Sequence, residues 1–153
     1  LFCSVGSYDG NFGYLDFDDP STTGELDDSV YLDLPVLDPY FGNPRDMEYM
    51  TQCNPTNIIN DVPPAQWEWL KETRYFIRSA SQNAKSAFME GTYYPRVKQF
   101  VELMESKGIM NHWNSEELVL SSTADHTWEY AKIWIKTTLP LHWELFGRYN
   151  EID

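Results

Sequence analysis

The chain has 153 residues and a net charge of −13, from 24 acidic and 11 basic side chains. This length suits one domain with a sizeable core, and an apolar content of 42% is too high for a disordered chain. A pI near 4.4 means that the chain repels phosphate groups, which argues against direct binding to nucleic acid or to an anionic lipid surface. We expect its partners to be other proteins.

The acidic charge is concentrated at the start of the chain. Between Leu1 and Met50 there are eleven acidic residues and one basic residue, Arg45, which gives this segment a net charge of −10. Glycines and prolines recur too closely for a helix of useful length, and the alternation in residues 29–34 favours one short edge strand that Pro35 ends. We therefore predict a long, extended, largely irregular acidic arm over residues 1–60.

Aromatic side chains are interleaved with the acids of this arm. Rings in an extended segment find apolar surroundings on another molecule, while the neighbouring carboxylates stay in water. The predicted partner contacts in the arm are Phe12, Tyr14, Phe17, Tyr31, Tyr40 and Phe41.

Residues 61–153 have the pattern of a helical domain. Asp61 before two prolines predicts a helix start, and apolar residues at three- and four-residue steps extend this first helix over about 62–90, with Gly91 ending it. A second helix is predicted over 92–107 and a third over about 115–139, ended by Pro140, with one or two further turns over residues 141–146 as an alternative. The fold class we predict is all-α, a small antiparallel three-helix bundle.

The third predicted helix has one apolar stripe that we expect to face the core. Its members include Trp128, Ala131, Ile135 and Leu139. The Ser-Ser-Thr-Ala-Asp sequence that ends at Asp125 is weak for a helix, so a break with a new start at Asp125 is an alternative.

Six tryptophans are more than such stripes can bury, because several fall on different helix faces. Interfaces favour tryptophan and tyrosine, and monomers rarely expose large apolar patches. We predict that Trp67, Trp113, Trp134 and Trp143 also contact a partner.

Motifs for catalysis or cofactor binding are missing from the sequence. No GxSxG, P-loop or GxGxxG pattern occurs, and His112, His126 and His142 lack a metal-binding spacing. We expect no enzyme activity, no metal site and no cofactor, although one histidine could ligate a haem or pigment within a larger complex. Cys3 and Cys53 do not form a disulfide scaffold, but a single bridge between them is an open alternative.

No apolar run is long enough to span a bilayer, so we expect no transmembrane segment, with peripheral attachment to a membrane complex left open. A first residue other than Met indicates either a removed targeting segment, which favours an organellar location, or a fragment.

These features together favour a non-catalytic accessory or structural subunit, a linker or extrinsic component that stabilises a larger multi-subunit assembly. An organellar membrane complex, such as a photosynthetic or respiratory supercomplex, is the context we expect by analogy. One alternative is an acidic mimic of nucleic acid that inhibits a DNA-binding protein, and another is a small enzyme or metal-binding protein.

Overall fold

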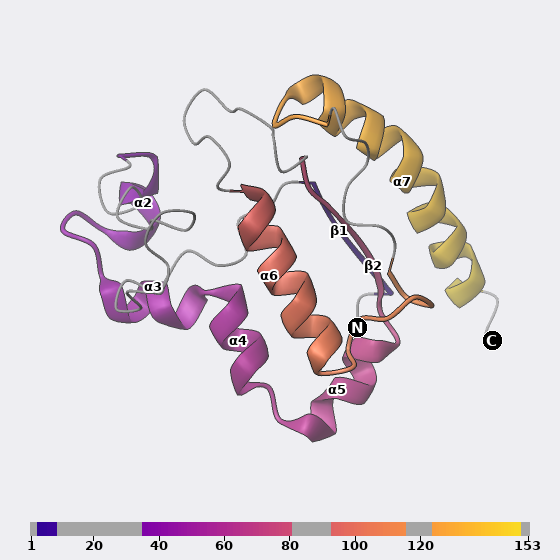
Figure 1. Ribbon diagram of the computed structural model, residues 1–153, viewed down its shortest axis with the longest axis horizontal. Helices are drawn as coiled ribbons and strands as arrows, with labels where there is room; N and C mark the ends of the chain where they lie inside the picture. Colours follow the sequence, from indigo (N-terminus) through magenta and orange to yellow (C-terminus); the bar gives the residue numbers. More distant parts are fainter. Residues whose placement is uncertain (1–2, 9–34, 81–92, 116–123, 151–153) are drawn as a thin grey trace.

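The computed structural model describes residues 3–8, 35–80, 93–115 and 124–150 (Figure 1). These ranges contain two strands, one 3-10 turn and six α-helices. In chain order they are β1 (Ser4–Tyr8), η2 (Pro35–Leu37), α2 (Asp38–Phe41), α3 (Met47–Cys53), α4 (Pro55–Asp61), α5 (Pro64–Lys71), β2 (Arg74–Arg78), α6 (Tyr93–Ser106) and α7 (Trp128–Asn150).

The prediction of an all-α three-helix bundle is wrong, because β1 and β2 form a parallel two-stranded sheet. Ser4 lies opposite Arg74 and Tyr8 lies opposite Arg78, so the strands pair over their whole length. The backbone N–H of Arg74 also donates to the carbonyl oxygen of Cys3 at 2.9 Å. The mostly helical chain is thus organised around a small sheet.

β2 lies inside the range predicted for the first helix. Its central residues Tyr75, Phe76 and Ile77 are all buried, one toward one face of the sheet and two toward the other. A parallel strand covered on both faces is a continuous apolar run, and such a run also fits a helical stripe. Among the described residues of the predicted helix 62–90, only Pro64–Lys71 is helical.

The predicted irregular arm is also wrong for its second half, where η2, α2, α3 and α4 follow one another. Side-chain caps make these short helices possible. Asp46 accepts a hydrogen bond from the N–H of Tyr49 at 2.9 Å, and Asn54 accepts one from Thr56 at 3.2 Å. Pro55 occupies the first turn of α4, where its missing N–H costs nothing, so a proline there begins a helix. The predicted edge strand at 29–34 lies outside the described residues.

The sheet has a different helix on each face, and Figure 1 shows β1 and β2 lying between α6 and α7. On one face, Tyr75 and Ile77 join the main core, which also contains Val97, Phe100 and Met104 of α6. α6 occupies nearly the range predicted for the second helix, and Gly108 with φ 65° follows its end.

α7 covers the other face, and it begins and ends later in the chain than the predicted third helix. It begins at Trp128, three residues after Asp125, and continues through Pro140 to Asn150 instead of ending at 139. Proline removes one helical hydrogen bond, but Thr138 before it and His142 after it both face the sheet. Packing on both sides of Pro140 therefore keeps the helix continuous.

Close approach of α7 depends on Gly6. A Cβ atom at this position would lie 2.9 Å from Nε2 of His142 and 3.1 Å from the indole ring of Trp134. Only glycine leaves room for both rings, so residue 6 sets the distance between β1 and α7.

Replacing Gly6 by alanine should destabilise the fold by about 1–3 kcal/mol, because two rigid rings must move away from the sheet. Urea unfolding followed by circular dichroism measures the change. The matched control is Gly147→Ala on α7, where nothing lies within 4 Å and the substitution should be neutral or stabilising by about 0.5–1 kcal/mol. Equal unfolding midpoints for Gly6→Ala and the unmodified chain would contradict this packing.

Candidate functional site

The structure tests where six of the ten predicted contact residues lie. Phe12, Tyr14, Phe17 and Tyr31 are outside the described residues. Three of the remaining side chains are largely exposed, as a partner contact requires: Tyr40, Trp113 and Trp143.

The other three predicted contacts are half-buried within the chain. Trp67 packs against the main core, and its indole N–H donates to the carbonyl oxygen of Val62 at 3.0 Å. Trp134 faces β1, where its ring lies 6.3 Å from that of Tyr8, and Phe41 lies 5.9 Å from the ring of Tyr49. These rings are used mainly inside the fold.

α7 carries an exposed apolar row that we call the α7 ridge. Its members follow one another at steps of seven, four, four and three residues, which keeps them on one side of a helix. Trp128 is 77% exposed, Leu139 61% and Trp143 76%, so most of this surface is in contact with solvent. The α7 ridge consists of Trp128, Ile135, Leu139, Trp143 and Phe146.

The expected orientation of this helix is therefore wrong, since Trp128, Ile135 and Leu139 were predicted to face the core. The face that packs on the sheet contains Trp134, Thr138 and His142 instead. The sequence pattern did not indicate Thr138 and His142, because polar residues do not contribute to an apolar stripe. The signal that could have located the α7 ridge is the presence of large apolar residues on two sides of one helix.

His142 is held at the sheet by three contacts. The hydroxyl oxygen of Ser4 lies 2.6 Å from Nδ1 of His142, and the ring of Phe76 meets the imidazole edge at a centroid distance of 4.6 Å. Gly6 lies directly beneath Nε2. Burial lowers the pKa of His142, because desolvation disfavours the charged imidazolium.

A serine beside an imidazole is the first part of a nucleophile and base pair, but such a pair needs a third group that orients the imidazole. Among the described residues, His142 has Ser4 as its polar partner and lies beside Phe76 and Gly6. This arrangement positions α7 on the sheet.

An apolar pocket of about 380 Å³ lies on the opposite face of the sheet. It is formed where α4, α5 and α6 meet the two strands, and Val5 of β1 and Trp69 of α5 are among its more exposed lining side chains. No charged side chain lines it among the described residues. The complete described lining is Val5, Ile59, Val62, Gln66, Trp69, Leu70, Thr73, Tyr75, Ile77, Phe100 and Met104.

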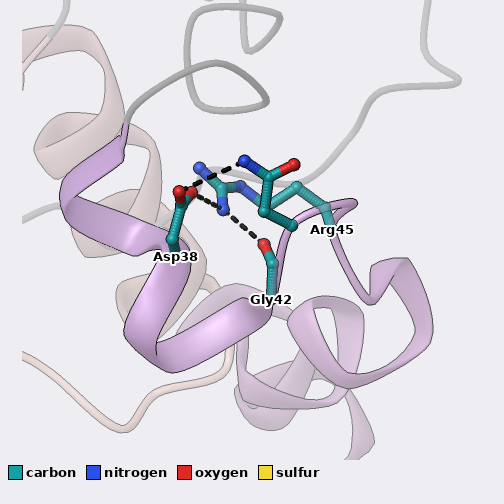
Figure 2. A network of polar contacts seen from close by, with 4 residues as sticks. Asp38, Gly42 and Arg45 are labelled. Atoms are coloured by element: carbon teal, nitrogen blue, oxygen red, sulfur yellow. Dashed lines mark hydrogen bonds and ion pairs between the residues drawn. The ribbon is translucent and has the colours of Figure 1, made fainter.

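A polar network closes the turn after α2. Figure 2 shows Arg45 reaching back to the carboxylate of Asp38 and to the carbonyl oxygen of Gly42. Asn43 donates a second hydrogen bond to Asp38 at 3.2 Å, and Arg45 holds the pKa of Asp38 below its usual value. These groups bind one another, so the network fixes the segment that presents the exposed Tyr40.

No three His, Cys, Asp or Glu side chains in the described ranges lie close enough to share a metal ion, and the thiols of Cys3 and Cys53 are free. Of the helices that the structure describes, none has the length and apolar character needed to cross a bilayer.

Comparisons with protein-family models, with curated proteins and with solved structures found no match to this chain.

The lowered pKa of His142 predicts that the folded chain loses stability in mild acid. The unfolded chain takes up a proton near the ordinary pKa of 6.5, whereas the folded chain takes it up only at lower pH. The free energy of unfolding should thus be constant above about pH 7 and fall as the pH drops below about 6.5. Urea unfolding between pH 7.5 and 5.5 measures this slope.

His142→Gln should remove most of that slope, because the amide cannot gain a proton in this range. The control is His112→Gln, since the side chain of His112 is exposed. The prediction is contradicted if the pH dependence of the unfolding free energy persists in His142→Gln and disappears in His112→Gln, because His112 would then be the group that takes up the proton.

Proposed function

We propose that this chain is a non-catalytic accessory subunit, which docks through the α7 ridge onto another subunit of a multi-subunit assembly. The observation that carries the proposal is the exposure of five large apolar side chains along one side of α7. From Trp128 to Phe146 the ridge is about 27 Å long at the helical rise per residue. Monomeric proteins rarely leave such a continuous apolar surface in water.

The composition of the α7 ridge also favours a protein partner. Tryptophan is among the residues that contribute most to interface energy, and the ridge has one near each end. Lys132 and Lys136 fall beside the ridge by helical spacing, and both are exposed. In a chain with a net charge of −13, these cations favour an acidic surface on the partner.

The enzyme alternative requires a histidine in contact with a buried carboxylate. The described contacts of His142 are not of this kind, and His126 is exposed. The organellar context and the possible pigment or haem remain predictions from the sequence.

Two glutamates placed on the α7 ridge should release the chain from its assembly. We expect the wild-type chain in extracts of its native cells to sediment far above its own 17.9 kDa, and the Leu139→Glu/Trp143→Glu variant to sediment near that mass. Both sites are exposed, so the isolated variant should keep its helical circular dichroism.

The control is Ile133→Glu/Thr137→Glu, which adds the same charge to exposed positions on another side of α7. It should sediment with the wild type. A wild-type chain that sediments as a monomer, or a ridge variant that stays in the heavy fraction, would overturn the proposal.

The salt dependence of binding distinguishes this proposed function from mimicry of nucleic acid. Docking through apolar side chains should change by less than about threefold between 0.1 and 1 M NaCl, because screening acts on charges. An acidic mimic in a basic groove should lose affinity by about 10³-fold or more over that range. The fraction of chain in the heavy sedimenting species, measured at both salt concentrations, decides between them.

A further inference from the structure

The apolar pocket on the α6 face of the sheet has a buried floor and an exposed rim. At the rim, Val5 is 40% exposed and Trp69 is 60% exposed. The pocket is therefore open to solvent on one side and extends inward to the main core. Its floor consists of lining side chains that are at most 6% exposed, namely Tyr75, Ile77, Phe100 and Met104.

The polar groups near this floor are hydrogen-bonded within the chain. The hydroxyl group of Tyr75 donates to the carbonyl oxygen of Leu70 at 2.8 Å, and the side chain of Thr73 bonds the same hydroxyl group. Gln66, the remaining polar residue of the described lining, is exposed. The floor thus offers rings, methyl groups and a thioether to a ligand, so the part of a ligand that reaches it should be apolar.

The charges around the pocket are nearly balanced. No lining side chain is charged among the described residues, and the surrounding residues 55–78 and 93–107 contain five acidic and six basic side chains. Some of these charges pair with one another, as Lys71 does with Glu68 at 2.7 Å and Lys98 with Glu102 at 3.6 Å. A charged ligand would lose its hydration here without gaining a partner in the lining, so the occupant should be uncharged.

The volume of the pocket restricts the size of the occupant. Its 380 Å³ lies within the range of pockets that bind small molecules, about 300–1,000 Å³. An apolar cavity of about 150 Å³ holds one benzene ring, so two fused rings fit this pocket. A single leucine or phenylalanine side chain from a protein partner is no larger than one ring and would leave about half of the volume to water. The volume therefore favours a small molecule over such a side chain.

We propose that this pocket binds an uncharged, mainly apolar small molecule with the size of about two fused rings. The rings pack on Phe100 and Met104 at the floor and lie beside Trp69 at the rim. A polar group of the ligand stays at the rim, where Gln66 is exposed. Burial of apolar surface supplies the affinity. The site lies on the opposite face of the sheet from α7 and does not depend on the α7 ridge.

The test is titration of the full-length chain with 2-naphthol, which has two fused rings and an uncharged hydroxyl group at pH 7. Two related compounds separate charge from size: 2-naphthoate has the same rings with a carboxylate, and phenol has a single ring. Isothermal titration calorimetry measures each Kd. NMR spectra of the methyl groups identify the residues that respond.

We expect one site for 2-naphthol with a Kd below about 1 mM, and shifts of the methyl signals of Ile59 and Met104. Binding of 2-naphthoate should be weaker by about tenfold or more, because its carboxylate finds no cation in the lining. Phenol should also bind about tenfold more weakly, because it buries less apolar surface.

Two substitutions at the rim locate the binding site. Val5→Trp should weaken 2-naphthol binding by about tenfold because the indole ring takes up part of the pocket, whereas Ile133→Trp adds the same ring to an exposed position of α7 and should bind as the wild type. Trp69→Ala should weaken binding by about threefold or more, and Trp113→Ala, at another exposed tryptophan, should not. Circular dichroism shows that each variant is folded.

Three results would overturn the proposal. The first is the absence of saturable 2-naphthol binding that shifts the Met104 methyl signal. The second is binding of 2-naphthoate or phenol that is as tight as that of 2-naphthol, because the pocket would then select neither charge nor size. The third is an unchanged Kd in both Val5→Trp and Trp69→Ala. None of these results affects sedimentation through the α7 ridge, so the two proposals fail separately.

Discussion

The pairing of β1 with β2 is the constraint on which the rest of the fold depends. It joins residues 4–8 to residues 74–78 through main-chain hydrogen bonds, and α6 packs against one of these strands while α7 packs against the other. α7 needs Ser4 and Gly6 from one strand and Phe76 from the other. Without the pair, neither helix layer would have a complete surface to pack on.

The sequence indicates α6 well, because its determinants are local. Val97, Phe100 and Met104 repeat at helical steps and are all buried, and Gly108 follows in the left-handed conformation. The sequence did not indicate β2, because a strand that is buried on both faces lacks the alternation of apolar and polar residues by which strands are recognised. The sequence did not indicate β1 either, because this short, glycine-containing segment becomes a strand only when β2 lies beside it.

α7 shows a different limit of the helical pattern. The periodicity of apolar residues indicates which residues share one side of a helix. It does not indicate which of two such sides packs against the core. The close packing around Gly6 selects Thr138 and His142 for the inside and leaves Leu139 and Trp143 outside. The abundance of tryptophan predicted an interaction surface, yet the fold alone decides which tryptophans belong to it.

The pocket could not be predicted from any local pattern. Val5, Ile59, Leu70 and Phe100 come from four separate elements, and only the sheet brings them together.

The layered order of the chain has a consequence for its synthesis. β1 emerges from the ribosome about seventy residues before its partner strand, and the helix that covers them both emerges after that. The growing chain therefore carries the uncharged sequence of β1 without its partner until residues 74–78 arrive, and a sheet without α7 until residue 142 does. Contacts this distant in sequence close slowly, so nascent chains are exposed to aggregation and to chaperones throughout that interval.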